Sequence, residues 1–182
     1  NGCNERWYDC GRGNSGKTIK VFKKRIHKKV SRKFNFLKKD FEMNYDEQNI
    51  FAKIIRGELP AEKIYEDEKV LAFMDIMPRS PGHFLVIPKA SVRNILDIDN
   101  ESLCAVIKVV KKLAVASKKA MNATGITIQQ FSEADGGQEV FHLHFHIIPR
   151  YEGKPMDRPG QMVKDMSVLS LQANKIKAEL GA

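Results

Sequence analysis

Apolar residues in the region 43–182 recur with the two periods that distinguish helices from strands. A spacing of three and four residues predicts a long helix over 101–123, whose apolar stripe is Leu103, Val106, Ile107, Val110, Leu113 and Ala114. The same spacing predicts a short helix capped by Asp46 or Asn49, and another over 167–180. Apolar runs bounded by turn residues predict strands over 63–66, 69–75, 83–88, 126–132 and 140–151. We therefore predict an α+β fold, in which an antiparallel sheet carries one long helix, a short N-terminal helix and a C-terminal helix.

Residues 1–42 form a basic segment with a different pattern. They hold 13 Lys and Arg against 4 Asp and Glu, whereas residues 43–182 hold 18 of each sign, so the basic segment carries the whole formal charge of +9. The spacing over 17–42 is compatible with a basic amphipathic helix for anionic lipid or nucleic acid, although runs of like charge commonly stay disordered. Because charge and pattern change at Met43, we expect a domain over 43–182 that begins at a functional start codon. Nucleic acid is not expected as a partner of that domain.

The basic segment also contains a literal match to a phosphate-binding motif. Residues 11–18 read G-R-G-N-S-G-K-T, which fits the P-loop pattern G-x-x-x-x-G-K-S/T. A P-loop follows a buried apolar strand that holds its amides toward the phosphates, and the preceding residues NERWYDC cannot form one. We therefore do not interpret this match as a nucleotide site.

The overall composition narrows the class of protein. The chain of 182 residues is 42% hydrophobic and 29% charged, which is ordinary for a globular domain. No run approaches the roughly 18 apolar residues that a membrane span needs. Its three cysteines cannot all pair and show no C-x-x-C spacing, which favours a reducing, cytoplasmic location.

Three of the five histidines lie in one short stretch, H-L-H-F-H-I-I at 142–148. Side chains alternate along a strand, so His142, His144 and His146 are predicted to share one face. Such a face suits metal binding by neutral imidazoles, or attack by one imidazole while its neighbours orient it. The second is favoured because no Asp or Glu shares the face within the strand. The D-G-G-Q turn at 135–138 could bring backbone amides and the Gln138 side chain close to an anion.

These residues resemble a known family. His142–Ile148 resembles the histidine-triad (HIT) motif, His-φ-His-φ-His-φ-φ with φ apolar. The segments IFAKIIRGELPAEKIYEDE at 50–68 and LAFMDIMPRSPGHFLVIPK at 71–89 resemble the Hint branch of that superfamily. The resemblance covers about residues 46–150. It implies hydrolysis of purine nucleoside phosphoramidates or adenylylated amines at the α-phosphorus, with no metal or other cofactor required, by a homodimer.

The resemblance also implies roles for individual residues. His144 would be the nucleophile that forms a nucleotidyl-histidine intermediate, and His142 and His146 would orient it and contact the phosphate. His83 would complete the polar site, and Asp75 would bind the ribose. The other implied binding residues belong to the apolar slot for the base and to the turn before the histidines: Ile50, Phe51, Ile54, Phe73, Ile76, Gly137, Gln138 and Glu139.

The sequence departs from the Hint pattern at two places and leaves alternatives open. Phe131 and Ser132 stand where Asn is common, and Glu139 stands where Ser is often found and is thought to assist the leaving group. The alternatives are a dinucleoside-polyphosphate hydrolase, which the IFAKIIRGELP segment argues against, and a nucleotide-binding or scaffold module with vestigial activity. A metal-dependent enzyme that uses the three histidines is a third.

Overall fold

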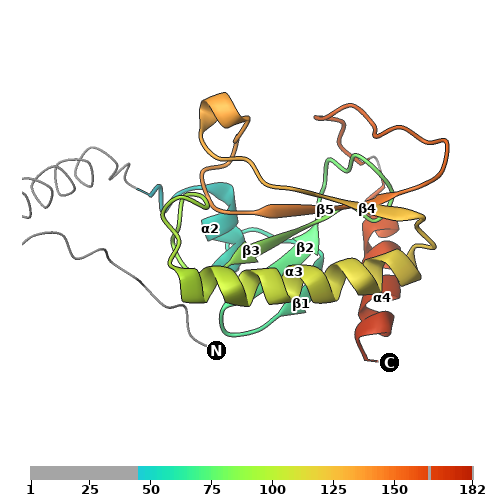
Figure 1. Cartoon of the computed structure of the whole chain (residues 1–182), viewed down its shortest axis with the longest axis horizontal. Helices are drawn as coiled ribbons and strands as arrows, with labels where there is room; N and C mark the ends of the chain where they lie inside the picture. The colour runs from blue at the N-terminus through green and yellow to red at the C-terminus, as the bar shows by residue number, and fades with distance from the viewer. Residues whose placement is uncertain (1–44, 164, 182) are drawn as a thin grey trace, which may run out of the picture. The chain divides into compact units, whose positions relative to one another are not determined.

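The computed structural model of the chain describes residues 45–163 and 165–181. The basic segment, the helix considered within it and Met43 lie outside the described residues. The elements in chain order (Figure 1) are α2 (Ile50–Ile55), β1 (Lys63–Glu66), β2 (Val70–Met74), β3 (Phe84–Pro88), α3 (Asn100–Ala120), β4 (Gly125–Gln129), the 3-10 turn η1 (Ala134–Gly136), β5 (Phe145–Arg150) and α4 (Ser167–Leu180).

The strands form one antiparallel sheet in the order β1-β2-β3-β5-β4. The last strand in the sequence is therefore inserted between β3 and β4, and β4 is left at an edge. The register between β5 and β3 pairs His146 with Leu85, close to the residue where β3 begins. The α+β class predicted from the sequence is confirmed, together with the long helix and the C-terminal helix.

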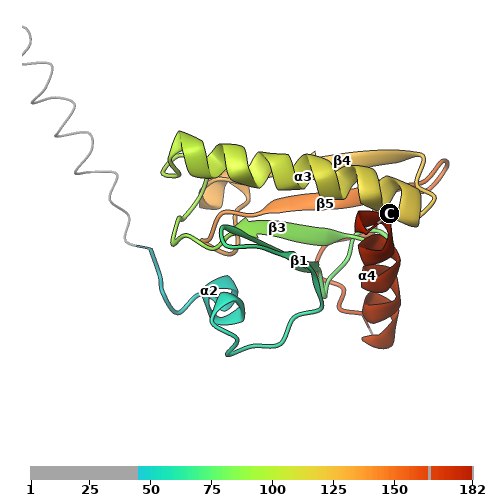
Figure 2. The ribbon, with the colours of Figure 1, turned by 90° about the horizontal axis from the view of Figure 1, so that it is seen from below.

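Alternating side chains of β2 and β3 divide the apolar residues between two clusters. Val70, Ala72 and Met74 pack into the larger cluster with α3 and α4, while Leu71 and Phe73 face the other side with α2. Figure 2 shows α3 along one face of the sheet and α2 on the opposite side. Both faces of these central strands are covered, which explains why their sequences read as continuous apolar runs.

Two of the helices, α2 and α3, begin at side-chain caps. The side chain of Asn49 accepts hydrogen bonds from the backbone N–H groups of Phe51 and Ala52, and so begins α2. Asp99 accepts from the N–H of Ser102 at the start of α3. Each cap satisfies donors that a helix N-terminus leaves without a partner. For the short helix, the structure selects Asn49 over Asp46.

Two strand boundaries differ from the prediction by more than one residue. β4 ends at Gln129 rather than Ser132, and β5 begins at Phe145 rather than Val140. One neighbour of β5 in the sheet is β3, which ends at Pro88, a residue without an N–H group. The backbone instead bends, with the N–H of His142 donating to the carbonyl of Val140. His142 and His144 consequently precede the strand, and only His146 lies within it.

The chain after β5 returns to the loop between β2 and β3. The N–H of Asp157 donates to the carbonyl of Arg79, and the N–H of Val163 donates to that of Ile76. α4 then packs on α3 and β1 through Leu169, Ala173 and Ile176. Among the helices of the described residues, none has the length and apolarity to cross a membrane.

Gly82 gives a test of this packing. Its φ is +82°, and a Cβ added there would lie 2.8 Å from Cγ of Met121 at the end of α3. We expect Gly82→Ala to lower the free energy of unfolding by about 2–4 kcal/mol, combining left-handed strain with overpacking. Urea denaturation at neutral pH provides the measurement.

Gly57→Ala is the matched control, because Gly57 has a φ of +76° and open space around its Cβ position. It should cost only the strain, about 1 kcal/mol. Equal losses in the two variants would show that Met121 does not confine Gly82.

Candidate active site

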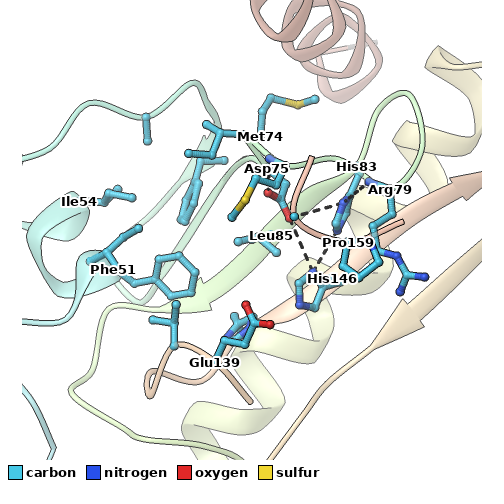
Figure 3. Close-up of a pocket in the computed structure, with 18 of the residues that line it drawn as sticks. Phe51, Ile54, Met74, Asp75, Arg79, His83, Leu85, Glu139, His146 and Pro159 are labelled. Atoms are coloured by element: carbon cyan, nitrogen blue, oxygen red, sulfur yellow. Dashed lines mark hydrogen bonds and ion pairs between the residues drawn. The ribbon is translucent and has the colours of Figure 1, made fainter. Parts of the chain in front are cut away.

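A cavity of about 500 Å³ lies against the α2 side of the sheet and contains two of the three clustered histidines. Figure 3 places Phe51 and Ile54 at one end, Asp75, His83 and His146 toward the middle, and Arg79 at the other end. The residues expected to bind the base and ribose all line this cavity: Ile50, Phe51, Ile54, Phe73, Asp75 and Ile76. Because His144, His146 and Pro159 also line it, the cavity joins residues that are far apart in the sequence.

His144 is held by a single hydrogen bond of 2.7 Å between its Nδ1 and the carbonyl oxygen of His142. A carbonyl can only accept, so Nδ1 carries the ring proton and Nε2 keeps a lone pair. Burial lowers the pKa of His144, and its ring makes a T-shaped contact with the ring of Phe51. The result is a neutral imidazole in the wall of the cavity, with its basic nitrogen unprotonated.

His83 and His146 belong to a series of hydrogen bonds in which each donor and acceptor can be assigned. The N–H of Arg79 donates to Nδ1 of His83 at 3.1 Å, so the proton of neutral His83 is on Nε2. That nitrogen lies 3.0 Å from Nδ1 of His146, which must accept, and the proton of His146 is therefore on its own Nε2. Burial lowers the pKa of His83 to about 4 and that of His146 to about 3. Both rings are neutral near pH 7.

Asp75 closes the polar side of the cavity. Its Oδ1 accepts from the N–H of Met77 at 2.8 Å, while its Oδ2 lies 3.4 Å from Nδ1 of His83 and 3.9 Å from Nδ1 of His146. Burial raises the pKa of this carboxyl. Because both imidazoles are neutral, these contacts are not charged pairs.

Among the described residues, a metal could be held by Asp75, His83 and His146, since one potential ligand atom from each lies within 4.8 Å of the others. A metal ion would fit these three residues poorly, however. His83 already accepts a backbone proton at Nδ1, and its Nε2 is hydrogen-bonded to His146. A metal would have to replace these bonds, so we derive no step through one.

His142 differs from its expected position. It is fully buried but is not among the residues that line the cavity. Its Nε2 lies 2.9 Å from the carbonyl of Pro88, and its Nδ1 is hydrogen-bonded to the hydroxyl of Tyr45. Both ring nitrogens are engaged with the protein, so the expected contact with a phosphate is not available in this structure. What His142 supplies to His144 is its backbone carbonyl.

The turn before the histidines also differs from the prediction. The N–H groups of Gly136, Gly137 and Gln138 all donate to carbonyls within the turn, and so they are not presented to an anion. The side-chain amide of Gln138 is buried and donates to the carbonyls of Arg93 and Val140. The next N–H, that of Glu139, makes no hydrogen bond with the described residues, and Glu139 lines the cavity together with Gly137.

Glu133 holds this turn in place at a cost. Its φ of 63° and ψ of 165° lie in a region normally reserved for glycine, which costs about 1–3 kcal/mol. Its carboxylate accepts from the guanidinium of Arg93, at 2.8 Å from Nη2, and from Asn94 at 2.6 Å, and its N–H donates to Gln138. These bonds offset the strain. Gln138 is therefore a structural anchor of the turn.

Sequence reasoning missed several residues of the cavity and its support. Arg79, Pro159 and Gly160 line the cavity, and Glu133 and Arg93 hold the turn. Arg79 belongs to the segment MPRSPG, in which the prolines and the glycine were the visible signal. Pro159 and Gly160 reach the cavity only because the chain folds back after β5, and no local pattern indicates that.

Comparison with known proteins identifies close relatives. A HIT domain model matches residues 56–153. An uncharacterized HIT-like protein of Methanocaldococcus jannaschii is 44% identical over 131 residues, which cover 72% of this chain and 97% of the relative. The crystal structure of a HIT-like protein from Bartonella henselae involved in cell-cycle regulation is 54% identical, with a TM-score of 0.72, and the match covers 76% of this chain and all of that one.

Two further solved structures bear on the chemistry. A hypothetical histidine triad nucleotide-binding protein from Sulfolobus tokodaii is 35% identical, with a TM-score of 0.67, over 72% of this chain and 91% of that one. A zinc-bound histidine triad family protein from Mycobacterium smegmatis is 30% identical, also with a TM-score of 0.67, over 74% of this chain and 94% of that one.

The burial of His142 makes stability dependent on pH. The pKa of its side chain is about 4 in the folded protein because of burial, against 6.5 for the ordinary group. Between these values the unfolded chain binds a proton that the folded chain does not, so stability falls as the pH falls from 6.5 to 4. His142 alone should contribute roughly 3 kcal/mol to this loss, at about 1.4 kcal/mol per pKa unit.

Urea denaturation at several pH values between 7 and 4 measures the slope, and His142→Gln should reduce it. Gln can still donate to the carbonyl of Pro88, and a uniform loss of stability does not affect a comparison of slopes. An unchanged slope in His142→Gln would contradict the expectation.

Proposed function

The chain belongs to the HIT domain family, and on that premise we propose that it is a Hint-type nucleotide hydrolase. Its substrates would be purine nucleoside phosphoramidates or adenylylated amines, cleaved at the α-phosphorus. The observation that carries the proposal is the hydrogen bond from Nδ1 of His144 to the carbonyl of His142, which leaves an unprotonated Nε2 at the cavity wall. The nucleotide-binding description of the Sulfolobus tokodaii protein supports the substrate class.

In the proposed reaction, Nε2 of His144 attacks the α-phosphorus and forms a P–N bond to the enzyme. The bond from phosphorus to the leaving nitrogen breaks, its electron pair stays on that nitrogen, and the amine takes up a proton from solvent, which the water of the second step returns. Water then attacks the phosphorus and releases the nucleoside monophosphate from His144. The Nε2–H of His146 donates to a phosphate oxygen, and the direction of the His83–His146 chain keeps that proton in place.

The rest of the cavity suits the nucleoside. A purine would lie among the apolar side chains of Ile50, Phe51, Ile54 and Phe73, and Ile76 would lie beside the sugar. Ile50 is 44% exposed and Ile76 is 37% exposed, so a bound ligand would cover apolar surface that now faces water. Oδ2 of Asp75, which has no hydrogen bond within the described residues, would accept from the ribose hydroxyls.

We also propose that the enzyme is a homodimer. The outer surfaces of α3 and the edge strand β4 form a shallow apolar groove, in which Ile107, Val115 and Ile128 are 43%, 53% and 49% exposed. A second copy related by a two-fold axis would cover the groove and pair the open edge of β4. Absence of a required cofactor and a cytoplasmic location remain predictions from the sequence.

Substitution of the nucleophile tests the activity. We expect His144→Ala to lose about 10⁴-fold or more of the hydrolysis of adenosine phosphoramidate, since no other neutral imidazole nitrogen of the cavity is oriented to replace it. Release of ammonia measures the rate. Binding of AMP by calorimetry is the control, because an intact slot should still bind the nucleotide.

Other outcomes distinguish the alternatives. Undiminished hydrolysis by His144→Ala would end the nucleophile assignment, and AMP binding by an inactive wild type would favour a binding module. Loss of wild-type activity with a chelator, restored by zinc, would favour the metal-dependent alternative. Preference for a dinucleoside polyphosphate over the phosphoramidate would favour the other hydrolase branch.

A charge in the groove tests the dimer. We expect Val115→Glu to shift the protein from dimer to monomer, because it would bury two carboxylates at a two-fold interface, at a cost of several kcal/mol. Light scattering after size exclusion gives the mass. Leu171→Glu on α4, at 63% exposure outside the groove, is the matched control and should stay dimeric. A monomeric wild type would refute the proposal.

A further inference from the structure

Among the described residues, Arg79 is the one Lys or Arg that lines the cavity, and the acidic lining residues are Asp75 and Glu139. Figure 3 shows it on the far side of His146 from Phe51 and Ile54. If the nucleoside occupies the apolar end, the phosphorus lies at His144 and His146, and the leaving group extends toward Arg79. This placement rests on the proposed function.

The guanidinium of Arg79 is anchored but its charge is not paired. Its Nε donates to the carbonyl oxygen of Asp157 at 3.2 Å. Its terminal nitrogens make no hydrogen bond or ion pair with the residues of 45–163 and 165–181. Arg93 differs from Arg79 in this respect. The guanidinium of Arg93 pairs with Glu133 and stacks on Phe141, so its charge is already bound within the protein. Arg79 keeps two donor nitrogens and a full charge for something else.

The surroundings hold Arg79 in position. Its backbone N–H donates to His83, and its backbone carbonyl accepts from the N–H of Asp157. The side chain is therefore tethered at both ends, with the backbone tied to the catalytic histidine chain and Nε tied to the returning segment. Its proximity to the reacting centre is reflected in the pKa values of His83 and His146, which its charge helps to lower after the larger effect of burial.

We propose that Arg79 forms an anion subsite for the leaving group, so that the preferred substrates are phosphoramidates whose amine carries a carboxylate. A guanidinium with free terminal nitrogens can bind a carboxylate through two parallel hydrogen bonds. Figure 3 shows Glu139 on the Phe51 side of His146, away from Arg79, so a carboxylate on the leaving group would meet Arg79 rather than Glu139. The subsite selects among substrates of one reaction and performs no chemical step itself.

A matched pair of substrates tests this subsite. Adenosine 5′-phosphoramidates of β-alanine and of β-alaninamide differ only in the charge of the distal group. We expect wild-type kcat/KM to favour the acid about tenfold, the effect of one charge-assisted hydrogen bond, mainly through KM. The preference should shrink as salt is added. In Arg79→Gln the ratio should fall to about one.

Arg158→Gln is the matched control. Arg158 is exposed, lies in the same returning segment and does not line the cavity, so this variant removes an equal charge without removing the subsite. It should keep the wild-type ratio. The backbone N–H that binds His83 survives any substitution of the Arg79 side chain, and the salt dependence of the wild type gives a measurement that needs no variant.

The outcomes separate this inference from the proposed function. Hydrolysis of both substrates with equal kcat/KM, or a preference that survives in Arg79→Gln, would overturn the subsite and leave the hydrolase standing. If the ratio of the two kcat/KM values also fell to about one in Arg158→Gln, the preference would come from the general electrostatic field of the protein. That result would also overturn the subsite. Hydrolysis of neither substrate by the wild type, nor of adenosine phosphoramidate, would remove both proposals together.

Discussion

The hydrogen bond from Nδ1 of His144 to the carbonyl oxygen of His142 decides which ring nitrogen carries the proton and which keeps a lone pair. A carbonyl oxygen accepts and never donates, so the tautomer of His144 does not depend on any titratable neighbour. The bond requires the backbone to bend between Val140 and His144 rather than to continue β5, and the burial of His142 stabilises that bend. The nucleophile is therefore oriented by the course of the main chain.

The same arrangement recurs on the other side of the cavity. There the backbone N–H of Arg79 sets the tautomer of His83, and His83 sets that of His146. Each chain starts at a main-chain group, whose donor or acceptor character is the same at every pH. Burial then lowers the pKa values of the histidines and keeps them neutral. Glu133 and its ion-pair partner Arg93 take no part in the proposed reaction, but they hold the turn that precedes the histidines.

Much of the fold could be predicted because the pattern of apolar residues within each helix or strand shows which of its faces are buried. The stripe of α3 and the apolar runs of β2 and β3 follow from helical and strand periodicity, and Asn49 is one of the two caps predicted for the short helix. The ends of β4 and β5 could not be predicted, because they depend on where the partner strand stops. Pro88 ends β3, but only the sheet order places β3 beside β5 and so makes that ending relevant to His142.

The sequence by itself determined the α+β class, the family resemblance, and which residue types meet at the site, since three histidines in seven residues and two long motifs are properties of the linear chain. Only the tertiary structure decided how each side chain is used. Gln138 anchors a turn, His142 is buried outside the cavity lining, and Arg79 lines the far end without an ion pair to any described residue. The physical reason is that a polar side chain can bind a ligand only through donors and acceptors that are not already hydrogen-bonded within the protein. Many of those hydrogen bonds join residues distant in the sequence, so they exist only after folding.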